Sequence, residues 1–267
     1  MSLLELTVGV GIFSMVMLLV MGILTESFRL SSRANSQTAT EEVLFKVHNR
    51  LSKELTNTGR ARTVATSVGP ATIAAVPDGD AIWFLSFINP ATGDPVFDDG
   101  ALGGEVAEPV WQRNIMYYSV VPSNHDALVG QSCSGADGGE GYEDQCPHKV
   151  LVCKVIDLPD GPDGKEPLLN SSAGYLDRPN GLDVSGMSGP NVESVRIMGT
   201  NLLTFRAELT SQPPPLERDE VEITVRASSL NEARKLVAVG SVPLSVEKST
   251  IEQRFSIFPK NSPGEAP

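Results

Sequence analysis

The sequence lacks the short motifs by which many enzymes are recognised. It holds no P-loop, no dinucleotide-binding glycine fingerprint and no His-Glu-x-x-His motif. Residues 185–189 (SGMSG) do not place glycine both two residues before and two residues after a serine, as a nucleophile elbow requires. These absences predict a protein that is not an enzyme.

Aromatic residues are also scarce, at 6% of the 267 residues, whereas glycine and proline number 24 and 19. Because glycine and proline mark turns and interrupt helices, this composition favours a β-rich body with long connections. Basic residues are outnumbered, and the net charge is −12. Residues 63–267 carry 14 Lys/Arg against 28 Asp/Glu. Such an acidic body repels DNA, so we expect no nucleic acid partner.

Charge is nearly absent from residues 1–24, where Glu5 is the single charged side chain. A helix of this length spans about 36 Å, which exceeds the bilayer core of about 30 Å. No basic region precedes the segment and no small-residue cleavage site follows it, as a secretory signal peptide would require. We therefore predict a transmembrane helix over residues 1–24.

Glu5 is unusual in such a helix, because a carboxylate inside the bilayer costs about 2.5–3.5 kcal/mol on insertion scales. It is expected to be protonated or to pair with a terminal amine, either of this chain or of a neighbour. In an ordinary anchor it would instead reach the headgroups, and the spacing leaves both interpretations open. Gly9, Gly11 and Gly22 either allow close approach of packed helices or are simply tolerated in an anchor.

Residues 25–58 contain no proline or glycine and are expected to continue the helix. Apolar residues recur there at three- and four-residue steps: Leu44, Val47, Leu51 and Leu55. This spacing predicts an amphipathic helix whose apolar side needs a partner surface. Gly59 is expected to end the helix as a C-cap.

Residues 59–267 are predicted to form a globular domain of short strands. Apolar runs between turn residues predict strands over 72–76, 81–88, 110–111, 114–121, 150–156, 192–197, 202–209, 221–227 and 254–258. An antiparallel sheet of such strands against the amphipathic helix is an α+β architecture. Residues 122–147 and 158–189 exceed typical loops of about 4–6 residues. Long loops carry recognition or are decoration without a partner, and both interpretations stay open here.

The three cysteines are Cys133, Cys146 and Cys153. A membrane anchor would place them outside the cytoplasm, where a disulfide is the default state. Cys133–Cys146 is the first candidate pairing, and Cys146–Cys153 is its rival. With His148, the cysteines could also supply a Cys3His zinc site. Their spacing differs from that of CxxC knuckles, so a disulfide is preferred.

Four acidic residues stand in one glycine-containing loop: Asp157, Asp160, Asp163 and Glu166. Oxygen-rich loops of this kind bind Ca²⁺, although the spacing is not that of an EF-hand. A solvated acidic loop is the preferred interpretation, so no cofactor is expected.

Residues 2–8 (SLLELTV) and the residues after them resemble the N-terminus of the type IV pilin-like family. The residues after them are Gly9, Gly11, Ile12 and Phe13. In that family a prepilin peptidase cuts after a glycine, the new first residue is N-methylated, and a glutamate stands fifth. The resemblance implies that Met1, where the family usually has Phe, is the methylated first residue of the mature chain. It also implies that Glu5 pairs with the Met1 amine of an adjacent subunit and sets register during assembly.

The body resembles the PilW-type minor pilins and the J-type pseudopilins of type II secretion. The resemblance rests on Trp111, Tyr117-Tyr118, Leu151-Val152, and residues 192–195 and 254–257. It implies a structural minor pilin of the bacterial inner membrane, with its body in the periplasm, that helps start a type IV pilus and stays at its tip on the cell surface. Partners would be other minor pilins, the major pilin, the inner-membrane assembly platform and a PilY-type tip adhesin. A type II secretion pseudopilin and a single-pass membrane-anchored binding protein are the alternatives.

Overall fold

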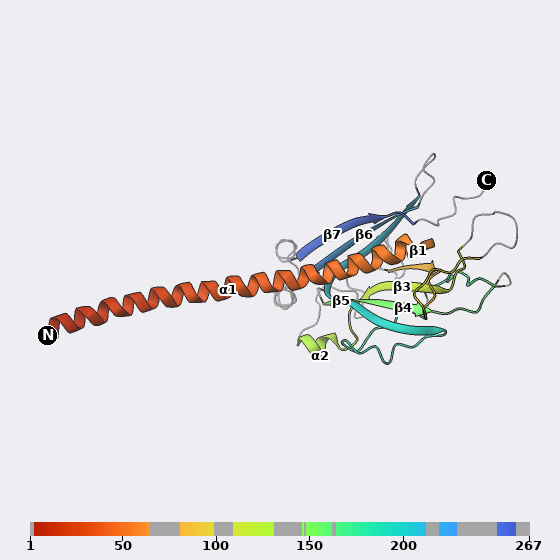
Figure 1. The fold of residues 1–267 in the computed structure, drawn as a ribbon. Helices are drawn as coiled ribbons and strands as arrows, with labels where there is room; N and C mark the ends of the chain where they lie inside the picture. Colours follow the sequence, from red (N-terminus) through yellow and green to blue (C-terminus); the bar gives the residue numbers. More distant parts are fainter. Residues whose placement is uncertain are drawn as a thin grey trace.

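The computed structural model describes residues 3–64, 81–98, 109–130, 146, 148–161, 164–172, 174–211, 219–228 and 250–259. The elements in chain order are α1 (Leu3–Thr56), β1 (Thr58–Val64), β2 (Ala81–Ser86), β3 (Arg113–Val120), α2 (His125–Val129), β4 (Lys149–Ile156), β5 (Val192–Ser211), β6 (Asp219–Ser228) and β7 (Thr250–Ile257). One long helix and a set of antiparallel strands make the α+β layout that the sequence predicts (Figure 1).

The described strands form a single sheet in the order β1-β2-β3-β4-β5-β6-β7. Each strand pairs antiparallel with the next one in the chain, so the sheet is a meander. Every pairing is thus local along the chain. The predicted strand over residues 72–76 lies outside the described residues.

Two of the predicted strands, 192–197 and 202–209, are wrong as separate elements, because β5 runs without a break from Val192 to Ser211. The apolar pattern is interrupted where the backbone departs from regular strand geometry. Asn201 has a φ of 57°, in the left-handed region, and the pairing with β6 shifts register between Leu202 and Thr204. The predicted strand at 110–111 is also wrong, because β3 begins at Arg113.

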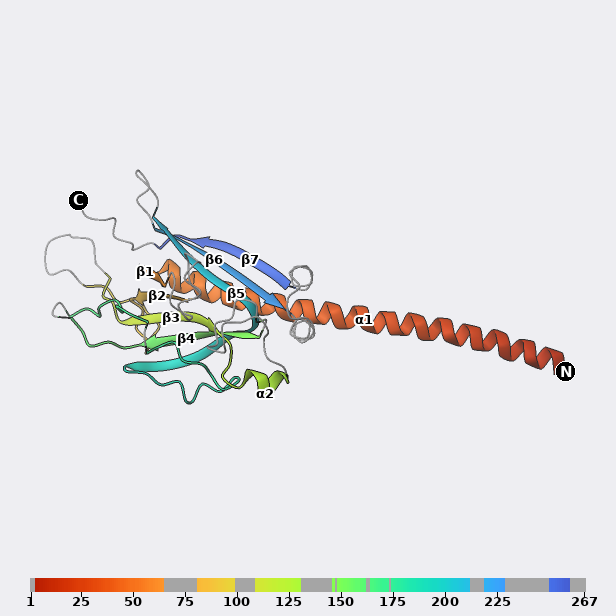
Figure 2. The same cartoon turned by 180° about the vertical axis from the view of Figure 1, so that it is seen from behind.

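Helix α1 has two halves with different surroundings. Its N-terminal part projects away from the body, and its C-terminal part runs alongside the strands (Figures 1 and 2). The predicted apolar stripe is buried against the sheet: Leu44, Val47, Leu51 and Leu55 are each 3% exposed or less. Gly199 of β5 permits this close approach, since a Cβ there would lie 3.1 Å from Val43 Cγ1. This half of the helix therefore packs on the sheet through its apolar stripe.

The predicted C-cap at Gly59 is wrong. The helix ends at Thr56, and Gly59 lies inside β1. Strand pairing takes over the backbone before Gly59, since Thr58 pairs with Ser86 and its hydroxyl donates to the Leu85 carbonyl at 2.5 Å. A glycine in a strand weakens it only modestly, so pairing with β2 decides the boundary.

The opposite face of β2–β4 is covered by the described part of the segment 158–189. Leu169, Tyr175 and Met187 of this segment are buried with Trp83 and Tyr118 of the sheet. Trp83 Nε1 donates to the Leu169 carbonyl, and the Tyr118 hydroxyl donates to the Asp177 carbonyl, both at 2.8 Å. This segment is therefore part of the core rather than a free surface loop.

Candidate functional site

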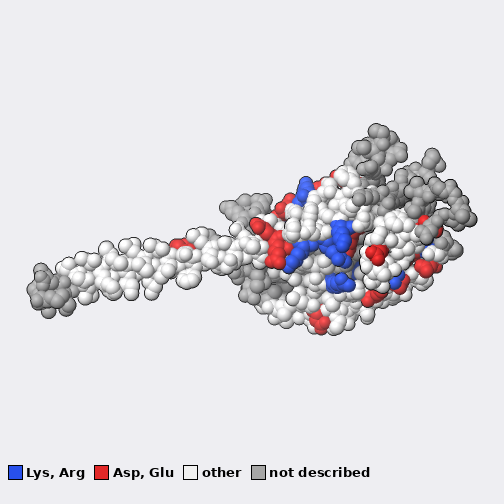
Figure 3. Space-filling model, in the orientation of Figure 1, with Lys and Arg blue, Asp and Glu red and all other residues white. Residues whose placement is uncertain are grey.

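The N-terminal half of α1 presents apolar side chains to its surroundings. From Val8 to Leu24 the described large apolar residues are between 44% and 74% exposed. Figure 3 shows this projecting part almost without charged side chains, whereas the body carries many of both signs. The first described ion pair along the helix joins Arg29 to Glu26 at 2.8 Å.

This helix is long and apolar enough to cross a membrane. None of its most apolar window is buried within the protein, so it does not serve as the core helix of the body. Apolar surface on this scale is unfavourable in water and favours a lipid or protein environment. The segment thus has the length and composition of a membrane anchor or a signal sequence.

The structure describes little of Met1 and Glu5, the two residues that are expected to direct assembly. Met1 lies outside the described residues, and Glu5 belongs to α1 by its backbone, with its side chain outside the description. Among the described residues, nothing packs against the glycines nearby. A Cβ added to Gly9, Gly11 or Gly22 would meet nothing within 4 Å.

A polar contact joins the amphipathic half of α1 to the sheet. The Tyr117 hydroxyl of β3 donates to Glu54, which also pairs with Arg50 one turn earlier. Burial, with the neighbouring Cys153 and Glu54, raises the pKa of Tyr117 well above its usual value. The hydroxyl therefore stays protonated and keeps its role as a donor. This bond fixes the rotation of α1 relative to β3.

The cysteines separate into two environments. Cys146 is disulfide-bonded, whereas Cys153 is a free, buried thiol. The pairing Cys146–Cys153 is therefore wrong, which leaves Cys133–Cys146 of the two candidates; Cys133 itself lies outside the described residues. Burial raises the pKa of Cys153 to about 12, so this thiol is not a ready nucleophile or metal ligand.

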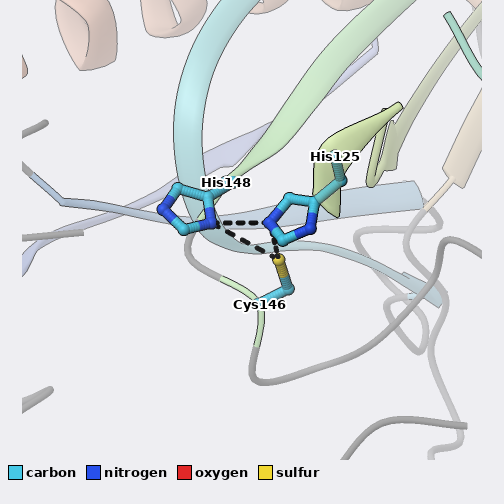
Figure 4. A group of neighbouring side chains, drawn as sticks. All are labelled: His125, Cys146 and His148. Carbon is cyan, nitrogen blue, oxygen red and sulfur yellow. Dashed lines mark hydrogen bonds between the residues drawn. The ribbon is translucent and has the colours of Figure 1, made fainter. Parts of the chain in front are cut away.

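Three buried side chains converge beside α2. His125 Nε2 lies 2.8 Å from His148 Nδ1, and the Cys146 sulfur lies 3.6 Å from the first nitrogen and 3.9 Å from the second. Figure 4 shows the three side chains directed at one another. The Cys3His zinc set is wrong as a cluster, because Cys153 lies in the core that faces α1. His125 was not among the predicted ligands, since it is remote in sequence and only the fold brings it to Cys146.

Arg113, from β3, lies beside two of the four acidic residues that the sequence offers as calcium ligands. Arg113 lies 3.2 Å from Asp157 and 4.0 Å from Glu166. Glu166 is buried and its Oε1 accepts hydrogen bonds from the backbone and the side-chain amide of Asn114. Arg113 thus supplies cationic charge to two of the four calcium candidates. Asp163 lies outside the described residues, so the calcium hypothesis stays a prediction.

Comparisons with protein-family models, curated proteins and solved structures find nothing that matches this chain.

Proposed function

We propose that this chain is a structural, non-enzymatic minor pilin that helps start a type IV pilus and stays in the complex at its tip. The observation that carries the proposal is a single unbroken helix with two unlike halves. Its N-terminal half exposes apolar side chains, and its C-terminal half packs on an antiparallel sheet through one buried stripe. This layout suits a subunit that waits in the inner membrane, with its body in the periplasm, and then packs its helix against others in a filament.

Glu5 gives this packing its register. In lipid, a carboxylate and an amine have no water as an alternative partner, so an ion pair between them is favoured. The amine is that of Met1 on the adjacent subunit, which requires that the mature chain start at Met1. Such a pair forms only at one axial offset between two helices, and it is lost when either group is neutralised or displaced.

The glycines of the apolar half support contact between helices. In the part of the chain that the structure describes, nothing packs against Gly9, Gly11 or Gly22, although glycine weakens a helix by about 1 kcal/mol relative to alanine. In helix bundles, small residues let backbones approach closely. A neighbouring pilin helix is the surface that would make use of them.

Partner capture by Glu5 variants tests the proposal. Glu5→Ala leaves membrane insertion intact, because it removes a charge from an apolar helix, but at least a tenfold loss of co-purification with the other minor pilins and the major pilin is expected. Glu26→Ala is the matched control: it removes an acid from the same helix, one that pairs locally with Arg29. Equal recovery of partners with Glu5→Ala and with Glu26→Ala would refute the electrostatic role.

Two other functions predict different partners for the wild-type chain. A type II secretion pseudopilin would co-purify with the pseudopilins of that machine instead of the pilus proteins. A single-pass membrane-anchored binding protein would be insensitive to Glu5→Ala and would capture its ligand through the body. Recovery of a PilY-type adhesin with the wild type supports the tip position, and recovery of the inner-membrane assembly platform supports a role in starting the pilus.

A further inference from the structure

The cluster of His125, Cys146 and His148 has the chemistry of a transition-metal site. Two imidazole nitrogens and one sulfur are the donors that Zn²⁺ prefers. The three residues are 4%, 0% and 8% exposed in the order named, so a bound ion would be shielded from water. His125 is the first residue of α2, and Cys146 and His148 lie just ahead of β4, so the fold itself assembles the set.

The orientation of His125 suits a ligand. Its Nδ1 lies 2.8 Å from Asp126 Oδ1. A carboxylate at this position holds the proton on Nδ1 and directs the lone pair of Nε2 toward His148, an arrangement common behind metal-bound histidines. His148 then donates from Nδ1 to His125 Nε2. A metal ion would take the place of that shared proton.

The distances between the three donor atoms come close to those between the ligands of a tetrahedrally coordinated zinc ion. With Zn–N of about 2.05 Å and Zn–S of about 2.3 Å, two nitrogens lie about 3.3 Å apart and a nitrogen and a sulfur about 3.6 Å apart. The sulfur distances of 3.6 and 3.9 Å are within a few tenths of an ångström of this value. The nitrogen pair, at 2.8 Å, has to separate by about 0.5 Å. Small rotations of the two imidazole rings achieve this.

We propose that the reduced chain binds Zn²⁺ through His125 Nε2, His148 Nδ1 and the Cys146 thiolate, and that disulfide formation empties the site. Oxidation removes two electrons from the Cys146 thiolate and its partner thiol and one proton from the partner thiol, and it releases the Zn²⁺. A disulfide-bearing oxidoreductase accepts the two electrons and that proton, takes a second proton from water and becomes a dithiol. The Cys146 sulfur then has no thiolate charge, the site keeps only two neutral nitrogens, and the metal leaves.

Such a site would act during maturation. The newly made chain carries thiols, and a bound ion would protect the Cys146 thiolate from premature pairing while it holds α2 against β4. Metal binding requires a thiolate and neutral imidazoles, so affinity falls as the pH is lowered. The mature, disulfide-bonded protein would hold no zinc at this position.

Cobalt binding tests the proposal, because a thiolate bound to Co²⁺ gives a charge-transfer absorption that imidazole alone does not give. Wild-type protein kept reduced by a phosphine is expected to bind one Co²⁺ with this band and to exchange it for Zn²⁺; the oxidised protein is expected to lack the band. Cys133→Ser leaves Cys146 unable to form the disulfide, so it should bind cobalt without reductant. Far-ultraviolet circular dichroism checks that each protein is folded.

Variants in the Cys133→Ser background assign the ligands. Cys146→Ser should abolish the charge-transfer band, and His125→Ala should weaken cobalt binding at least 100-fold. Asp126→Asn, which acts through His125, should weaken it about 10–100-fold and keep the band. Cys153→Ala is the matched thiol control and should change nothing. Absence of the band in the reduced wild type, its survival in Cys146→Ser, or retention of metal after oxidation would each overturn the proposal.

Discussion

Removing one side chain from the stripe on α1 measures how firmly the helix is attached to the body. Leu51 is fully buried in the core between α1 and the sheet. Leu51→Ala deletes three carbon atoms, which at about 0.8 kcal/mol each amounts to about 2.4 kcal/mol of lost burial. The cavity left behind adds to this, because the strands around it are fixed by sheet pairing. We therefore expect a total loss of about 3 kcal/mol in the free energy of unfolding.

The assay is urea unfolding of the full chain in a nonionic detergent, which covers the apolar half of α1. Trp83, buried on the far face of the sheet, reports unfolding of the body by fluorescence. In a thermal scan the same loss corresponds to a fall in Tm of about 6–12 °C. Phe45→Ala is the control, since Phe45 lies on the same helix and is 61% exposed, and it should change stability by less than about 0.5 kcal/mol. Equal effects of the two substitutions would show that the stripe is not packed on the sheet.

Three further results are expected. Burial raises the pKa of Glu166 to about 7 from 4.5, so the folded state holds this proton more tightly than the unfolded chain. The free energy of unfolding that this proton contributes is full below about pH 4.5 and falls by about 3 kcal/mol as the pH rises through 7. Glu166→Gln should remove this pH dependence from the unfolding curves. A stability that rises between pH 5 and 7 would contradict this. Gly199→Val should cost about 1–3 kcal/mol, because its methyl groups would meet Val43 and Val47 of α1, whereas Gly186→Ala, in open space, should be neutral in the same assay. Thiol labelling of the folded, oxidised protein should leave the buried Cys153 unmodified, and rapid labelling would show that it is accessible.

The elements that the sequence predicts well are those with a strict period. The stripe of Leu44, Val47, Leu51 and Leu55 follows the helical repeat, and the fold buries all four residues. β2 and β3 are predicted as apolar runs, and the fold buries both of their faces: Phe84 and Tyr117 face α1, while Trp83 and Tyr118 face the other side. Local pattern is sufficient here because each side chain has one direction set by its own backbone.

The features that the sequence does not reveal depend on contacts between distant segments. The segment 158–189 has the composition of a surface loop, yet a few apolar residues such as Leu169 and Met187 make it a layer of the core. His125 stands 21 positions from Cys146, and nothing in its neighbourhood marks it as a ligand. Asn201 lies inside β5 with a left-handed backbone. From the sequence alone, such an asparagine is not distinguished from one in a turn between two strands.

The mass of the N-terminal peptide from protein recovered from native membranes tests the central claim most directly. If the chain is a pilin-like subunit whose Glu5 pairs with a neighbour's terminal amine, tandem mass spectrometry finds Met1 first and finds one methyl group on its nitrogen. Any residues retained ahead of Met1 in the mature protein would separate that amine from Glu5 by extra turns of helix. Such a result would contradict the pairing and leave a membrane-anchored domain of another kind.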